Sequence, residues 1–230
     1  MTTTNTSKIE KACRLGDKTF EYILKNIKIG ETEKQIAYKI RKFIRKNNGR
    51  ISFRPIVAFG KNSANIHNIP TDNKLKKNQI ILLDFGIKLN GYCSDMTRVV
   101  FSGKPTTKQK RIYQTVLKAQ GKSLEILNTK YLMHKNISAR EVDKVARDYI
   151  VSKGYKTIPH GVGHGIGKKV HEGFHISPKS KKILRSGMVF SIEPGIYIPD
   201  FGGIRIEDLI VLTKNGPKLL THSPKHIIVI

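Results

Sequence analysis

The fold is decided by residues 80–98, which read IILLDFGIKLNGYCSDMTR. Two apolar runs flank Asn90-Gly91, the dipeptide that most strongly predicts a two-residue β-hairpin. Such a turn pairs Asp84 with Thr97 and puts Asp95 on the same face as Asp84, as a diagonal neighbour about 7–8 Å away at the backbone. A buried carboxylate is costly unless a cation compensates it. The hairpin therefore predicts two aspartates that converge on one or two shared cations.

A second pair of acids follows the same plan later in the chain. Glu193 comes directly after the apolar run Met188–Ile192, and Glu207 lies beyond a turn centred near Asp200. The two glutamates could face each other across this hairpin, but the length of the turn leaves their register open. Each half of the chain is thus expected to supply one carboxylate pair.

Helical periodicity and capping signals divide both halves in the same way. Capping boxes at Thr32 and Ser138 begin one helix in each half. Helices are expected over residues 7–27, 32–47, 108–127 and 138–153. Strands are expected over residues 51–59, 79–89, 92–101, 188–192, 196–198, 204–212 and 227–230. Each half reads helix, helix, strands, so we predict an α+β fold with an internal twofold repeat in a single domain, residues 1–230.

A glycine-rich loop before the second acid pair carries the densest group of histidines. Residues 160–167 read HGVGHGIG, and His171 follows closely. Because the loop lacks the spacing of phosphate-binding motifs, its glycines are expected to let the backbone approach a small substrate. His67 lies in a polar loop before the first acid pair, where a single histidine is more often a solvated surface group.

The acids and the loop together make an oxygen-rich ligand set with one imidazole: Asp84, Asp95, His164, Glu193 and Glu207. Mn²⁺, Fe²⁺ and Co²⁺ bind better to such oxygen-rich ligands than to a site made of soft thiolates. Two divalent cations about 3.5–4 Å apart would activate water at neutral pH. The alternative for each acid alone is a salt bridge to one of the 43 basic residues, but four acids beside one histidine loop favour the metal site.

The chain is strongly basic, with a formal net charge of +26. Basic surfaces bind nucleic acid without sequence preference. The lysines are spread along the whole chain, and no RNA-binding aromatic motif or zinc-finger spacing accompanies them. We therefore expect at most weak, nonspecific association with RNA or ribosomes.

The two cysteines, Cys13 and Cys93, form no CxxC motif and no disulfide framework. Free thiols favour a reducing compartment, so the cytoplasm is the expected location. The sequence has no apolar run long enough to span a bilayer and no signal-peptide pattern, so no membrane partner is expected.

Taken in order, these motifs resemble the metallopeptidases of the pita-bread fold, the group that contains methionine aminopeptidases and Xaa-Pro peptidases such as aminopeptidase P and prolidase. The resemblance covers nearly the whole chain. Its motifs are residues 83–86, 91–98, 160–167 with 171–172, 192–197 and 203–208. Glu-Pro-Gly-Ile-Tyr at 193–197 and Gly-Ile-Arg-Ile-Glu-Asp at 203–208 resemble the Xaa-Pro branch.

This resemblance implies a role for each candidate residue. Asp84 would bind one metal ion, His164 and Glu193 would bind the other, and Asp95 and Glu207 would bridge them. Two divalent ions are implied, with Mn²⁺ expected and Co²⁺, Fe²⁺ and Zn²⁺ as alternatives. The other implied roles are proton transfer by Glu193, stabilisation of the intermediate and substrate by His67 and His171, a proline pocket lined by His160, and orientation of the bridging acids by Arg205.

The implied activity is release of the first residue from short peptides or protein N-termini with proline second. The alternatives are removal of N-terminal methionine and a non-catalytic, RNA- or ribosome-binding member of the fold. Xaa-Pro peptidases usually carry an additional N-terminal domain, which this chain is expected to lack. A homodimer, and a preference for dipeptides or for longer peptides, therefore stay open.

Overall fold

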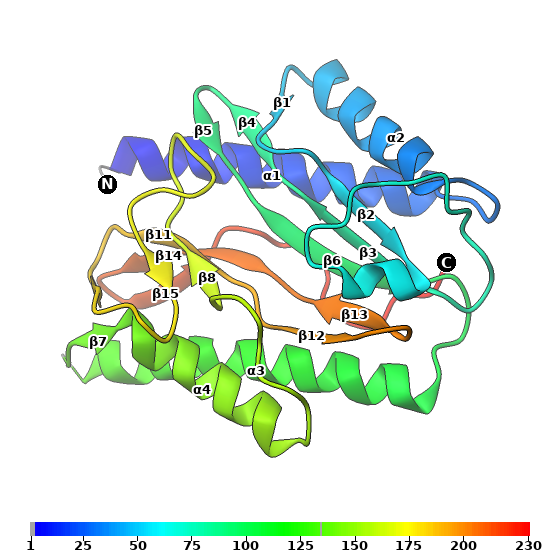
Figure 1. The fold of residues 1–230 in the computed structure, drawn as a ribbon. Helices are drawn as coiled ribbons and strands as arrows, with labels where there is room; N and C mark the ends of the chain where they lie inside the picture. Colours follow the sequence, from blue (N-terminus) through cyan, green and yellow to red (C-terminus); the bar gives the residue numbers. More distant parts are fainter. Residues whose placement is uncertain (1–2, 134) are drawn as a thin grey trace.

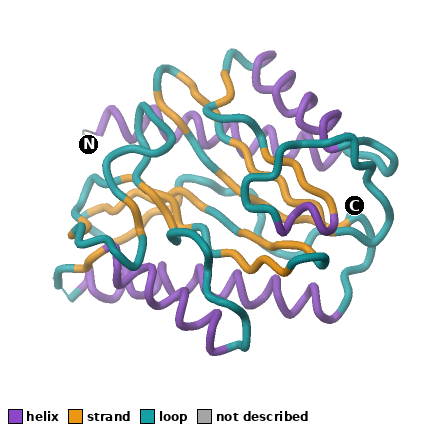
Figure 2. The backbone as a smooth tube through the Cα atoms, in the orientation of Figure 1, coloured by secondary structure: helices purple, strands orange, loops and turns teal. Residues whose placement is uncertain are grey.

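The computed structural model describes residues 3–133 and 135–230. Its four helices are α1 (Thr3–Asn26), α2 (Glu33–Lys46), α3 (Thr107–Leu132) and α4 (Ala139–Ser152), with a 3₁₀ turn, η1, at Gly60–Ala64. The first two helices lie on one side of the strands and the last two on the other (Figure 1). The strands fill the layer between the two helix pairs, and long loops join them (Figure 2). This is the expected α+β arrangement, in which each half contributes two helices and a set of antiparallel strands.

The strands are short and numerous. In the first half they are β1 (Arg50–Ile51), β2 (Ile56–Phe59), β3 (Ile80–Phe85), β4 (Ile87–Leu89), β5 (Tyr92–Cys93) and β6 (Met96–Phe101). In the second half they are β7 (Ile137–Ser138), β8 (Gly163–His164), β9 (His175–Ile176), β10 (Ile183–Leu184), β11 (Val189–Ile192), β12 (Gly195–Ile198), β13 (Gly202–Arg205), β14 (Asp208–Thr213) and β15 (Gly216–Leu219).

The hairpin predicted at Asn90-Gly91 is confirmed. Both residues have positive φ, 51° and 81°, as a type I′ turn requires. The turn joins β4 to β5, and the same register continues into β3 and β6, where Asp84 pairs with Thr97. Asp84 and the segment that carries Asp95 therefore lie on adjacent strands.

The second hairpin has a register that the sequence left open. Ile192 pairs with Asp208 in β11–β14, and Gly195 pairs with Arg205 in β12–β13. The residues between these two ladders, Glu193 and Glu207, are consequently opposite each other.

The predicted helices are confirmed, and their ends differ by a few residues. Both capping boxes form. The side chains of Thr32 and Ser138 each accept a hydrogen bond from the backbone amide of the residue three positions later, and the side chain of that residue accepts one from the backbone amide of the capping residue. Thr106 caps α3 through a hydrogen bond from the Gln109 amide, and α3 continues to Leu132, five residues beyond the expected end.

Several strand predictions are wrong in detail. The expected strands over 51–59, 79–89, 92–101 and 204–212 are each interrupted, and 227–230 makes one isolated bridge, Phe101 to Val229. Strands β7, β8, β9, β10 and β15 were not expected. One interruption is at Gly86, where a Cβ atom would lie 2.2 Å from both the Ser94 carbonyl oxygen and the Ser52 hydroxyl oxygen. Two of the interruptions contain Asp95 and Glu207, and Gly86 lies two residues after Asp84, so these ladders open where the carboxylates converge.

The apolar faces of the helices cover this layer on both sides. Ile36 and Ile40 of α2 pack in one buried cluster with Leu83, and Val116 of α3 packs in another with Phe190. Burial of side chains of this size contributes roughly 1.5–3 kcal/mol each, so the core fixes the strands that carry the acids. No helix in the described part of the chain is long and apolar enough to cross a membrane.

Candidate metal centre

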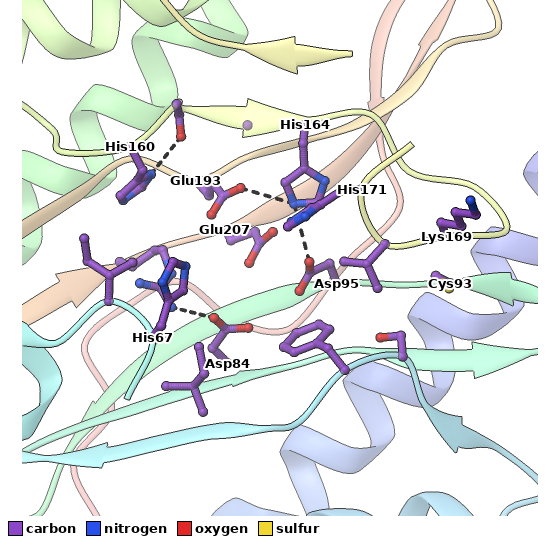
Figure 3. A pocket seen from close by; sticks show the side chains of 18 of the residues that line it. His67, Asp84, Cys93, Asp95, His160, His164, Lys169, His171, Glu193 and Glu207 are labelled. Carbon is purple, nitrogen blue, oxygen red and sulfur yellow. Dashed lines mark hydrogen bonds and ion pairs between the residues drawn. The ribbon is translucent and has the colours of Figure 1, made fainter. Parts of the chain in front are cut away.

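One cavity of about 760 Å³ is lined by residues from both halves of the chain. All nine side chains singled out in the sequence lie on its wall, and Figure 3 shows the four acids and His164 pointing toward its middle. The nine are His67, Asp84, Asp95, His160, His164, His171, Glu193, Arg205 and Glu207. The fold therefore brings together residues that are up to 140 positions apart in the sequence.

Each acid is positioned by the end of a strand. Asp84 is the second-last residue of β3, and Asp95 lies between β5 and β6. Glu193 directly follows β11, and Glu207 lies between β13 and β14. The backbone amide of Glu207 donates a 3.1 Å hydrogen bond to the Thr97 carbonyl oxygen, which joins the two halves at this point.

Three side chains form the tightest group. Asp95, His164 and Glu207 are buried, and each offers a ligand atom within 4.8 Å of those of the other two. The Nε2 atom of His164 lies 3.6 Å from Oδ2 of Asp95 and 3.4 Å from Oε1 of Glu193. This spacing matches ligands that surround one small cation and do not bind each other directly.

The buried oxygens of this group lack partners. Oδ1 of Asp95 and Oε1 of Glu207 accept no hydrogen bond from any described residue. Unpartnered buried carboxylate oxygens are strongly unfavourable, and a divalent cation is the partner that would satisfy them. The donor set thus fits the oxygen-preferring divalent metals expected from the sequence.

The pKa values of the site residues also favour a bound cation. Burial, with the neighbouring acids, raises the pKa of Glu207 well above its usual value. Burial raises the pKa of Asp84 to about 7, although Arg205 opposes the shift. Burial also acts to lower the pKa of His164, but Asp95 and Glu193 outweigh it and raise that pKa to about 9. The raised pKa values mean that the site favours bound protons, which reduce its negative charge. A bound cation would supply the same positive charge in place of those protons.

Two small hydroxyl residues that the sequence did not single out fix the acids. Thr97 donates a 2.8 Å hydrogen bond to Oε2 of Glu207. Ser191 donates to Oε1 of Glu193 at 3.0 Å and accepts from the His164 amide at 3.0 Å. Thr97 lies within the motif at 91–98 and Ser191 directly precedes the motif at 192–197, but neither residue type points to a metal site by itself, because serine and threonine are common in strands and turns.

Arg205 links the acids to the far wall of the cavity. Its guanidinium donates to Oδ2 of Asp84, to the Thr97 hydroxyl and, at 2.8 Å, to the Tyr197 hydroxyl. The Tyr197 hydroxyl in turn lies 2.8 Å from Nε2 of His160. Burial lowers the pKa of His160, so this imidazole is held neutral beside the cavity.

The remaining histidines differ in exposure. His171 is exposed and lies edge-on to His164, with ring centroids 4.2 Å apart. Partial burial and the nearby His164 lower the pKa of His171. His175 also lines the cavity, because it pairs with His164 across the short β8–β9 ladder. No sequence pattern selects His175, since a two-residue ladder has no periodicity to detect.

His67 lies exposed on the loop between β2 and β3. A fully buried acid, Glu33 at the start of α2, holds this loop in place. Its carboxylate accepts hydrogen bonds from the Phe59 amide, the Asn62 side chain, and the amide and hydroxyl of Thr71. A carboxylate with this many donors is a strong anchor, so Glu33 fixes the segment that carries His67.

The chain is similar to known peptidases along nearly its whole length. It is 40% identical to an Xaa-Pro dipeptidase of Pyrococcus horikoshii over 96% of this chain and 62% of that protein. An uncharacterised peptidase of Bacillus subtilis shows the same identity and coverage. A crystal structure of an X-Pro aminopeptidase from Thermotoga maritima matches with a TM-score of 0.94 at 36% identity, over 100% of this chain and 64% of that chain.

The chain spans about 62% of the length of the curated relatives that it matches. Its structural relatives include prolidases and X-Pro aminopeptidase, which supports the pita-bread fold expected from the motifs. The model of metallopeptidase family M24 matches residues 7–214, which include all five candidate ligands. The chain therefore belongs to metallopeptidase family M24.

Proposed function

We propose that this chain hydrolyses the first peptide bond of short peptides that carry proline in the second position, with residues 1–230 acting as one catalytic domain. The observation that carries the proposal is one cavity in which the four acids, His164 and four further histidines meet. The names of the relatives, Xaa-Pro dipeptidase and X-Pro aminopeptidase, support the substrate class.

We propose that two divalent ions, with Mn²⁺ expected, are held by Asp84, Asp95, His164, Glu193 and Glu207. When bound, such ions activate water and polarise the scissile carbonyl group. The two unpartnered oxygens in the buried group support this assignment.

The unpaired thiols of Cys13 and Cys93 support a reducing compartment, the cytoplasm, as the place where the protein works.

The side chains around the acids suit the proton transfers of peptide hydrolysis. Glu193 is half-buried and receives a hydrogen bond from Ser191, so its carboxylate is held where it can take a proton from water and deliver it to the leaving nitrogen. His171 and His67 reach the cavity from exposed loops. Their imidazoles are placed to donate hydrogen bonds to a developing oxyanion and to the substrate carbonyl group.

The wall beside His160 suits a proline ring. His160 and Tyr197 meet edge-on with ring centroids 5.5 Å apart, and the two side chains are hydrogen-bonded to each other. A rigid aromatic wall of this kind favours a compact apolar ring over a long flexible side chain.

The test is a hydrolysis assay with the Mn²⁺-loaded protein on Leu-Pro, Leu-Pro-Gly, Leu-Ala and Met-Ala-Ser. We expect cleavage of the two proline peptides, and loss of that activity in Asp95→Ala. Cleavage of Met-Ala-Ser in preference to the proline peptides would favour methionine removal instead. Absence of cleavage of every peptide with Mn²⁺, Co²⁺, Fe²⁺ and Zn²⁺ would contradict the proposal.

A further inference from the structure

The cavity extends to two sides of the acid group, and we refer to these two sides as its arms. Figure 3 shows His160 and His67 on one side of the acid group and Cys93 and Lys169 on the opposite side. Both pairs line the same cavity. If the wall near His160 receives proline, as proposed above, the arm near Cys93 is left for the side chain of the first residue. We call the second arm the Cys93 arm.

The Cys93 arm combines an apolar wall with a cationic rim. Phe53 and Val170 line the cavity together with three lysines, Lys88, Lys168 and Lys169. All three lysines are exposed, which places them at the mouth of the cavity. Such an arm would pack the carbon stem of a side chain and present positive charge to its end.

The backbone fixes the lysines around Cys93. Lys88 pairs directly with Cys93 in the β4–β5 ladder. The Cys93 amide donates a 2.8 Å hydrogen bond to the Gly167 carbonyl oxygen, and its thiol lies 3.4 Å from the Lys168 carbonyl oxygen. The loop that carries Lys168 and Lys169 is therefore tied to the strand that ends in Cys93.

The three rim lysines outnumber the one acid of the same loop, Glu172. None of the three lysines forms an ion pair within 4.0 Å of any described acid. The acid of the same loop, Glu172, accepts hydrogen bonds from the amides of Lys168 and Lys169, at 2.8 and 3.0 Å. Arg54 also lines the cavity and is exposed, which adds a fourth cation that forms no ion pair with a described acid.

The acids inside the cavity interact with groups other than the three lysines. Asp95 and Glu207 belong to the tight group around His164, and Asp84 is paired with Arg205. In the metal-loaded protein the divalent ions offset their charge, whereas the charge of the rim remains. The field at the mouth of the Cys93 arm is then positive.

We propose that Lys88, Lys168 and Lys169 determine specificity at the first residue of the substrate: they favour an acidic side chain and disfavour a basic one. This inference rests on the proposed function. Exposed charges interact weakly because water and salt screen them, so the preference is expected to be modest, about fivefold for glutamate over its neutral isostere glutamine.

The experiment measures kcat/KM of the Mn²⁺-loaded protein on Glu-Pro, Gln-Pro, Leu-Pro and Lys-Pro. Glu-Pro is expected to exceed Gln-Pro about fivefold at low salt, Lys-Pro is expected to be the poorest of the four, and the Glu-Pro advantage shrinks as the salt concentration rises. The triple variant K88Q/K168Q/K169Q is expected to bring the Glu-Pro to Gln-Pro ratio close to one.

A charge-matched control removes three exposed lysines that do not line the cavity, as K179Q/K181Q/K182Q. It has the same net charge as the first variant and is expected to keep the wild-type ratio. Should the first triple variant not fold, the single variants K88Q and K169Q are each expected to lower the ratio by part of the full effect.

Three results would overturn the inference while leaving the proposed function intact. The first is a wild-type protein that cleaves Leu-Pro but treats Glu-Pro and Gln-Pro alike. The second is an equal fall in the ratio for both triple variants, which would assign the preference to net charge. The third is an equal loss on Leu-Pro and Glu-Pro that disappears with prolinamide substrates, which would show that the lysines bind the proline carboxylate. Failure to cleave any Xaa-Pro peptide would instead reject the proposed function.

Discussion

The Thr97 hydroxyl donates a 2.8 Å hydrogen bond to Oε2 of Glu207, while Oε1 of the same buried carboxylate has no partner among the described residues. One oxygen is therefore fixed by the protein, and the other is left for a cation. Thr97→Val removes the donor and keeps the shape of the side chain. Metal affinity is expected to fall about tenfold, as is typical when a partner of a ligand is lost.

Calorimetric titration with Mn²⁺ measures this effect. Thr19→Val is the matched control, because Thr19 is equally buried but donates only to the Leu15 carbonyl oxygen in α1. Equal Mn²⁺ affinity in the two variants would argue against a role for Thr97 at the metal centre.

His171→Ala is expected to lower kcat on Leu-Pro by about 10²-fold or more, since loss of one oxyanion donor typically costs that much. The imidazole lies edge-on to His164 at the mouth of the cavity but outside the tight ligand group. Mn²⁺ content, measured by elemental analysis, is expected to stay at the wild-type level. His175→Ala is the control, since His175 is another exposed histidine of the cavity wall, with its ring centroid 6.3 Å from that of His171. A similar loss in both variants would contradict a specific role for His171.

Glu33→Gln tests whether a buried acid that does not itself line the cavity positions His67. The substitution keeps the size of the side chain but weakens the charge-assisted hydrogen bonds to Phe59, Asn62 and Thr71. Stability in urea is expected to fall by about 1.5–3 kcal/mol, and the loop after β2 is expected to be cut faster by protease. Glu10→Gln, which alters one exposed pair with Lys218, is the control. Unchanged cleavage of the loop in Glu33→Gln would argue against the anchor.

The ion pair of Glu141 with Lys130 predicts a pH-dependent stability. The hydrogen bond from Lys130, aided by the Ser138 amide, holds the pKa of Glu141 below its usual value. Since the folded-state pKa is the lower one, this stabilisation is present above the unfolded-state pKa of about 4.3 and is lost as the pH falls through the folded-state value. Glu141 is more than one-third exposed, so solvent screening keeps the contribution below about 1 kcal/mol.

The test compares urea unfolding of wild type and Glu141→Gln at several pH values. Glutamine preserves the capping box, so the variant is expected to be less stable only above about pH 4. Asp148→Asn, which removes an exposed pair with Lys144 on the same helix, is the control. A difference that stays constant as the pH falls would contradict the assignment.

The sequence predicted the parts of the fold whose signals are local. The Asn90-Gly91 turn and the capping boxes at Thr32 and Ser138 depend on a few adjacent residues, and all three formed as expected. The interruption of the strands could not be predicted, because apolar residues continue on both sides of Gly86. Only the close approach of Ser94 and Ser52 shows why the ladder breaks there.

The same limit applies to the site. The acids could be found because charge in the middle of apolar runs is a strong local signal. Thr97 and Ser191 carry no such signal. Glu207, the partner of Thr97, is 110 residues away in the sequence, and the two residues meet only in the folded chain. The register of Glu193 and Glu207 was likewise open until the ladders on either side were known.

The most direct test of the central claim is the number of Mn²⁺ ions bound per chain, measured by calorimetric titration of the metal-free protein. The wild type is expected to bind two, and Asp95→Asn/Glu207→Gln is expected to lose this binding. Asp17→Asn, whose carboxylate accepts hydrogen bonds from the His222 and Ser223 amides and does not line the cavity, is expected to behave as wild type. No binding by the wild type, or equal binding by the double variant, would contradict the claim that these side chains hold a pair of divalent ions.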